Sequence, residues 1–163
     1  MWWSRRAVLL ALTAAPLVAC GFTPAYAPGG PAAALAGRVA VQAPVTGPEY
    51  ILVARLEQRL GRAGEGAPLS LAYTLATGQE AVAITPAAEI TRYNVTGTLD
   101  WRLTDTATGT VAASGQVRSF TSYSATGSTI ATRAARDDAT ERLVTILADR
   151  TADEVVLKSA ARP

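Results

Sequence analysis

The 163-residue chain contains no histidine and a single cysteine, Cys20. Serine–histidine–aspartate triads, histidine acid–base catalysis and most zinc sites need imidazole or several thiolates, so these classes of chemistry are excluded. One cysteine cannot form a disulfide within the chain, and in an oxidising compartment its thiol would be a liability unless it is modified. We therefore expect no metal site and no cofactor.

The chain also has little net charge. It carries 15 basic and 13 acidic residues, a formal net charge of +2. Arg5 and Arg6 lie in a segment that we expect to be removed, and without them the two signs balance. The sequence therefore lacks the basic stripe that nucleic-acid binding needs, and we expect no nucleic-acid partner.

What the sequence does contain at its start is a leader. After Arg5 and Arg6, residues 7–18 are apolar apart from Thr13 and Pro16. This stretch is shorter than the ~20 residues of a membrane-spanning helix and has the length of a signal-peptide core. We predict a signal peptide over residues 1–19. The arginine pair faintly resembles a twin-arginine signal, so the general secretory and twin-arginine export routes both stay open.

The leader ends in a motif, residues 17–20, that resembles a bacterial lipobox. In a lipobox the cysteine sulfur is diacylated, the leader is cleaved before it and the new amine is usually acylated. Such chains, at ~0.8 kcal/mol per buried CH₂, anchor a protein stably. We predict that Cys20 carries the acyl chains, palmitate among them; the alternative is a secreted protein with an incidental cysteine. Gly21, where many proteobacteria place an inner-membrane retention Asp, favours delivery to the periplasmic side of the outer membrane.

Composition and periodicity divide the rest of the chain into two segments. Residues 20–36 are rich in proline and glycine and are predicted to be an irregular lipidated tether, in which Phe22 and Tyr26 either dock on the domain or lie close to the lipid. Residues 37–163 are predicted to form a single α+β domain. Its first half is expected to hold a strand over 38–42, a helix between Pro48 and Gly61, a strand over 69–76 and a less certain strand over 79–84, before a loop around Pro86.

The second half is predicted to be a hairpin followed by a helix. Alternation over 93–103 and 110–120 predicts two antiparallel strands, with Trp101 in the core and Val111 and Val117 facing inward. An amphipathic helix is expected over 129–157, before a fraying tail. Its expected buried residues are Ile130, Ala134, Leu143, Ile146, Leu147 and Val155 or Val156. Together these elements predict a two-layer sandwich, in which two helices pack on one face of an antiparallel sheet of about four strands.

Four segments in this order resemble a known family. They are residues 20–24 at the lipobox, 91–94 (Thr-Arg-Tyr-Asn), 119–125 (Ser-Phe-Thr-Ser-Tyr-Ser-Ala) and 138–143 in the last helix. Their order and spacing are similar to those of the lipopolysaccharide-assembly lipoprotein LptE family, in its alphaproteobacterial form. The resemblance implies a plug inside the outer-membrane β-barrel protein LptD, which assists assembly of the barrel and takes part in delivering lipopolysaccharide to the outer leaflet.

The residues are compatible with a plug. A domain inside a polar barrel lumen should be compact, near-neutral and rich in serine and threonine on its outer face. The polar positions of the long strand suit hydrogen bonds to a lumen wall, although any soluble sheet shows such a face. These positions are Thr96, Thr98, Asp100, Arg102, Thr104 and Asp105.

The resemblance also implies that basic residues contact lipopolysaccharide. Proximity to the family-like segments selects Arg92, Arg118, Arg133 and Arg136. We expect Arg92 and Arg133 to contact lipid phosphates or barrel loops, because a guanidinium fork matches phosphate geometry. The alternative for each is a solvated surface charge.

Two other functional classes stay open. One is an outer-membrane lipoprotein that acts as a different barrel-assembly or envelope adaptor. The other is a hydrolase with paired carboxylates, for which Asp137 with Asp138 and Asp153 with Glu154 are the pairs available. Neighbouring residues on a helix point about 100° apart and do not converge on one substrate. Asp149 and Asp153 share a face but lack supporting groups, so we expect no enzyme.

Overall fold

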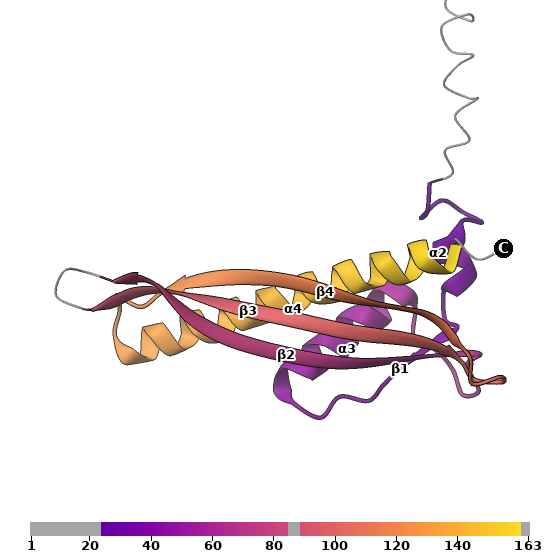
Figure 1. Cartoon of the computed structure of the whole chain (residues 1–163), viewed down its shortest axis with the longest axis horizontal. Helices are drawn as coiled ribbons and strands as arrows, with labels where there is room; N and C mark the ends of the chain where they lie inside the picture. The colour runs from indigo at the N-terminus through magenta and orange to yellow at the C-terminus, as the bar shows by residue number, and fades with distance from the viewer. Residues whose placement is uncertain (1–23, 85–88, 161–163) are drawn as a thin grey trace, which may run out of the picture.

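The structure is a computed structural model that describes residues 24–84 and 89–160. The predicted signal peptide, Cys20, Phe22 and the loop at Pro86 lie outside the described residues. The elements are α2 (Pro31–Leu35), β1 (Val39–Val41), α3 (Gly47–Leu60), β2 (Leu69–Ile84), β3 (Ile90–Asp105), β4 (Val111–Ser124) and α4 (Thr129–Ala160). Figure 1 shows them as an elongated domain, with α2 at one end and the β2–β3 hairpin at the other.

The four strands form one sheet in the order β1-β2-β3-β4. The pairs β2–β3 and β3–β4 are antiparallel, but β1 runs parallel to β2, with Val39 opposite Leu69. The prediction of a purely antiparallel sheet is therefore wrong at this edge. Helix α3 connects β1 to β2 and returns the chain to the same end of the sheet, so the second strand repeats the direction of the first.

Strand β2 is a single strand of 16 residues and not the two strands that the sequence predicted. Gly78, which lies between the two predicted strands, pairs with Thr96 within the ladder. A side chain at this position would begin 3.1 Å from the Thr96 hydroxyl oxygen, so the glycine permits a close approach of the two strands.

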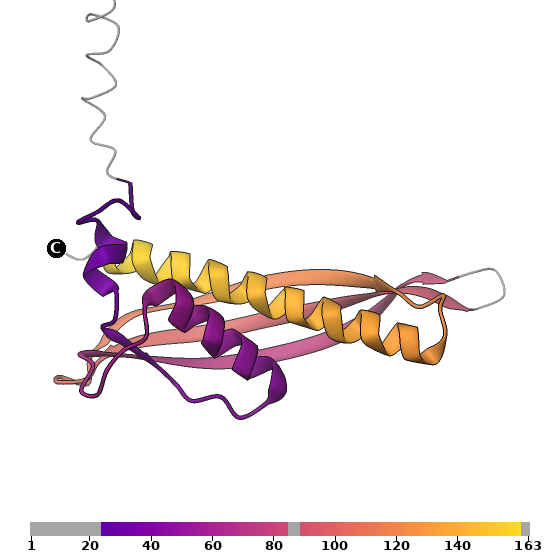
Figure 2. The same cartoon turned by 180° about the vertical axis from the view of Figure 1, so that it is seen from behind.

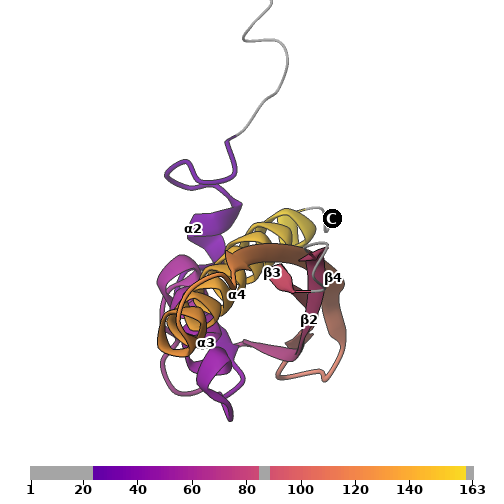
Figure 3. The same ribbon diagram turned by 90° about the vertical axis from the view of Figure 1, so that its left-hand side faces the viewer.

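Helices α3 and α4 cover one face of the sheet and leave the other uncovered, which gives two layers (Figures 2 and 3). The core between the layers takes the inward side chains of the strands and the apolar stripe of α3. Trp101 is 2% exposed, which confirms it as a core residue. Helix α3 begins and ends where the sequence predicts, with Pro48 in its first turn and Gly61 beyond its end at φ +77°.

The buried stripe of α4 begins later than predicted. Leu143, Leu147 and both Val155 and Val156 are buried as expected, but Ile130 is 83% exposed and Ala134 is also exposed, while Ile146 is half-buried. The strands twist away from the first turns of the helix (Figure 2), so no sheet lies beneath them. The stripe consists of Ala139, Leu143, Val144, Leu147, Ala148, Thr151, Ala152, Val155 and Val156.

A β-bulge explains why the predicted inward orientation of Val111 is wrong. Leu103 pairs with Ala113 and Thr104 pairs with Val111, so one residue of β4 is skipped. An extra residue in one strand reverses the face to which the residues beyond it point. Val111 is consequently 49% exposed and does not face inward.

Basic side chains of α4 bind carbonyl groups along β4, the free edge of the sheet. The contacts are Arg142 to the Ser122 carbonyl (3.4 Å), Arg150 to the Arg118 carbonyl (3.0 Å) and Lys158 to the Ser114 carbonyl (2.8 Å). Eight helical residues rise about 12 Å and four strand residues about 13 Å, so the two spacings match. These cations occupy carbonyls that would otherwise be open to pairing with another strand. Lys158, placed in the predicted tail, is therefore part of the helix.

The segment predicted to be an irregular tether contains a short helix. Helix α2 lies against the C-terminal end of α4, and Leu35 is 7% exposed as part of the core. The proline and glycine content of this segment predicted an irregular chain, but the apolar side chain of Leu35 packs into the core and holds the segment there.

Two buried threonines have opposite roles. Thr121 donates a hydrogen bond of 2.7 Å from its hydroxyl to the Ala139 carbonyl, whereas the hydroxyl of Thr151, which is 0% exposed, has no partner among the described residues.

We predict that Thr151→Val raises the free energy of unfolding by about 1 kcal/mol and that Thr121→Val lowers it by a similar amount. Urea denaturation measures both changes, and equal signs would contradict the assignment.

Candidate functional site

The uncovered face of the sheet is polar. It carries the alternate residues of β3 and β4 that point away from the helices, among them serines, threonines and arginines, and Asp100 accepts a hydrogen bond of 2.6 Å from Gln116. Val111, at 49% exposed, and Phe120 are the apolar exceptions. Phe120 lies opposite Thr96 and is 64% exposed, so one aromatic ring stands on a mainly polar surface.

Three arginines share this face. Arg92 lies opposite Ser124 and Arg102 opposite Ser114, about 33 Å apart along β3 at the usual rise of a strand. Arg118 lies between them, opposite Thr98. None of these three guanidinium groups has an ion-pair partner within residues 24–84 and 89–160.

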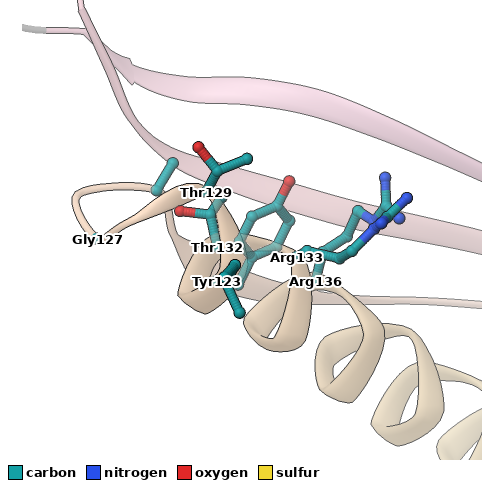
Figure 4. A pocket seen from close by; sticks show the side chains of 8 residues that line it. Tyr123, Gly127, Thr129, Thr132, Arg133 and Arg136 are labelled. Carbon is teal, nitrogen blue, oxygen red and sulfur yellow. The ribbon is translucent and has the colours of Figure 1, made fainter.

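The other two predicted arginines line a cavity on the helix side. Arg133 and Arg136 extend from the first turns of α4, and Figure 4 shows their guanidinium groups pointing the same way. The cavity measures about 600 Å³ and lies between these turns and the end of β4, where Tyr123 and Ile130 contribute apolar surface. Arg136 forms an ion pair of 3.3 Å with Asp137, whereas Arg133 has none among the described residues.

The four predicted residues therefore do not form one site. Arg133 and Arg136 lie together, Arg92 lies at the same end of the domain but on the other face, and Arg118 lies farther along that face. At this end of the sheet, where the two faces adjoin, the Ala125 amide donates to the Thr91 carbonyl at 2.9 Å. Arg92 and the cavity therefore flank one end of the domain.

The arrangement can bind an anion but offers no catalytic constellation. Arg133 and Arg136 can bind an anionic group, and the neighbouring Ile130 and Tyr123 side chains can contact an apolar part of the same ligand. Within the described ranges, no group of three or more carboxylates is placed to hold a metal ion. In the same ranges, every helix is too short or too polar to cross a bilayer.

Strand alternation could have identified two residues that the sequence analysis did not select. Arg102 was assigned only to the polar face, and Phe120 was noted only within a family-like segment. Because Val117 is buried, alternation places Phe120 on the opposite face, where an aromatic side chain is unusual.

The chain matches a family model. The model described as LptE, lipopolysaccharide-assembly, matches residues 36–154. No relative among curated proteins matches the sequence significantly.

Solved structures share the fold at low sequence identity. A candidate lipoprotein from Caulobacter crescentus CB15 has a TM-score of 0.66 at 20% identity, covering 82% of this chain and 98% of that one. An uncharacterised lipoprotein B from Nitrosomonas europaea has a TM-score of 0.60 at 13% identity, and the match covers 76% of this chain and 84% of that one. The rare lipoprotein B from Shewanella oneidensis has a TM-score of 0.53 at 13% identity, and the match covers 74% of this chain and 96% of that one.

The cavity generates a prediction about anionic amphiphiles. We predict that Arg133→Ala weakens binding of dodecyl phosphate about tenfold, because it removes a charge-assisted hydrogen bond that no internal ion pair replaces. Arg102→Ala is the matched control, since Arg102 also lacks an ion-pair partner among the described residues but lies on the other face. Titration calorimetry measures both affinities, and an equal loss in the two variants would contradict a site at the cavity.

Proposed function

This chain belongs to the LptE family of lipopolysaccharide-assembly proteins, and from that premise we propose that it is an outer-membrane lipoprotein that plugs an LptD-like β-barrel. In this proposal acyl chains on Cys20 anchor it on the periplasmic side. It assists assembly of the barrel and takes part in delivering lipopolysaccharide to the outer leaflet.

The uncovered sheet face is the observation that carries the proposal. One face of the sheet is covered by α3 and α4, while the other presents serine, threonine and three arginines along β3 and β4 that form no ion pair with any described residue. A polar lumen wall can form hydrogen bonds with such a surface. Phe120 supplies an exposed aromatic side chain on this face, of the kind that often dominates the energy of an interface.

The basic end of the domain supports a role in lipopolysaccharide contact. We assign Arg133 and Arg136 to the cavity site and Arg92 to the adjoining face, where they can contact lipid phosphates. Arg118 stands beside Phe120 on the face assigned to the barrel, so we place it at the protein interface.

A non-enzymatic role agrees with the family and with the positions of the carboxylates. The LptE family is a family of non-enzymatic assembly lipoproteins. Asp149 accepts a two-bond contact from Arg55, at 2.8 and 3.1 Å, and Asp153 pairs with Arg59 at 2.6 Å. These carboxylates are engaged in structural ion pairs. The remaining alternative is an adaptor for another envelope protein, which differs in the barrel that it binds.

Site-specific photo-crosslinking tests the barrel-facing surface. A photoreactive residue at Phe120 should crosslink to an LptD-like barrel in cells, because this side chain is 64% exposed on the uncovered face. The same residue at Tyr50, which is 62% exposed on α3, is the control and should give little crosslink. Equal crosslinking at the two positions, or crosslinking of Phe120 to a different envelope protein, would contradict the proposal.

A charge-removal variant tests the lipid contact. We predict that Arg92→Ala combined with Arg133→Ala lowers lipopolysaccharide binding at least tenfold and makes the cell envelope sensitive to detergent. Arg62→Ala is the control, because Arg62 is an exposed arginine that pairs with Glu57 away from this end. Unchanged binding and unchanged detergent resistance in the double variant would count against these residues.

A further inference from the structure

A polar cluster attaches the N-terminal segment to the helix layer. The Arg59 guanidinium donates to the Tyr26 hydroxyl at 2.8 Å and to Asp153 at 2.6 Å, and it lies 5.3 Å from the centre of the Tyr26 ring. The Tyr26 hydroxyl in turn donates to Asp153. Asp149 joins Arg59 to Arg55 in the same network. We call these five residues the N-terminal clasp.

The same segment contacts the domain at further points. The Gly37 amide donates to the Leu60 carbonyl of α3 at 2.9 Å, while the Ala32 amide closes the turn before α2 by donating to the Ala25 carbonyl at 3.0 Å. Gly61 is required at the contact with Gly37, because a Cβ atom there would lie 2.6 Å from the Gly37 nitrogen. With Tyr26 in the clasp and Leu35 in the core, the segment is therefore held between Tyr26 and Gly37.

The clasp keeps its hydrogen bonds at neutral pH. Burial raises the pKa of the Tyr26 phenol, and its hydrogen bond to Asp153 acts in the same direction. The hydrogen bond to Tyr26 raises the pKa of Arg59. The phenol therefore stays a donor and the guanidinium stays charged across the physiological range.

This attachment shortens the chain between the anchor and the domain. A free tether from Cys20 to Ala36 could extend to about 55 Å, whereas the four residues from Cys20 to Pro24 span at most about 14 Å. The described chain begins beside α2, which lies at the C-terminal end of α4 (Figure 1). Gly29, Gly30 and Pro31 line a shallow hollow there with Ser159 and Ala160.

The opposite end of the domain lies far from this point. Helix α4 has 32 residues, which corresponds to about 48 Å at the helical rise. Arg133 is twenty residues from Asp153 in the clasp, or about 30 Å along the same helix. The basic cavity therefore lies farther from the clasp than the ~14 Å that the chain from Cys20 to Pro24 can span.

We infer that the end of the domain formed by residues 24–36 and the last turn of α4 is a membrane-facing surface, held against the phospholipid headgroups by the N-terminal clasp. This inference rests on the proposed lipid anchor at Cys20. The clasp fixes the point at which the anchored chain leaves the domain. The basic cavity, at the opposite end of α4, then faces away from the bilayer that holds the anchor.

Fluorescence quenching in vesicles tests the orientation. Lipidation consumes the only thiol, so a single added cysteine can carry the probe. The mature lipoprotein is labelled at Ala160→Cys, beside α2, or at Ser128→Cys, at the far end of α4, and placed in phosphatidylethanolamine–phosphatidylglycerol vesicles with headgroup quenchers. We expect quenching at residue 160 to exceed that at residue 128 at least threefold. Equal quenching would overturn the inference.

Clasp variants test the cause of the orientation. Arg59→Gln and Tyr26→Phe should at least halve the difference between the two probes, since they release the chain that precedes α2 and lengthen the tether between Cys20 and the domain. The matched controls are Arg62→Gln and Tyr50→Phe, whose side chains are exposed on or just beyond α3 and should leave the difference unchanged. Thermal melting confirms that each variant is folded.

The outcomes separate the clasp from the anchor. Vesicle-bound variants that keep the full difference between the probes would overturn the role of the clasp and leave the anchor intact. Protein that fails to bind vesicles at all would contradict the anchor at Cys20 and with it the membrane-facing surface. Release of residues 24–30 in the two clasp variants should also make amide exchange there at least tenfold faster than in the controls.

Discussion

The close packing of α4 along β3 and β4 is the constraint on which the rest of the structure depends. Two glycines permit it. A Cβ at Gly97 would lie 2.8 Å from a methyl carbon of Leu147, and one at Gly115 would lie 2.5 Å from a Glu154 oxygen. Next to Gly115, the Trp101 indole donates to Glu154 at 3.2 Å. Because the helix occupies one face of the sheet over most of its length, the opposite face is left for a partner.

Much of the fold could be predicted from periodicity. Strand alternation placed Trp101 in the core, and the proline and glycine that bound α3 predicted its limits. The failures have physical causes that a single sequence does not display. The parallel pairing of β1 depends on the path of a crossover, the exposure of Val111 depends on one skipped residue, and the exposure of Ile130 depends on strand twist.

The candidate site was predicted less completely. Arg133 and Arg136 follow one another at helical spacing and do line one cavity. Arg92 was grouped with them by its position in the sequence, but strand alternation puts it on the other face of the sheet. The clasp could not be predicted, because Tyr26 and Arg59 are distant in sequence and meet only when α2 lies against α4.

These features give the domain two specialised ends and one specialised face. The proposed anchor leaves from the end that holds α2, the basic cavity occupies the other end, and the polar sheet face runs between them. In the proposed function, the membrane anchor, the lipopolysaccharide and the barrel contact different parts of the domain. The 32 residues of α4 separate its two ends.

The most direct test of this account is a mild-detergent purification of the tagged protein from native membranes, followed by mass spectrometry of the complex and of the Cys20 peptide. The account predicts an LptD-like barrel at a ratio of one to one, together with a triacylated N-terminus. Lipidated protein recovered without a barrel would contradict the plug function, and an unmodified Cys20 would contradict the anchor as well.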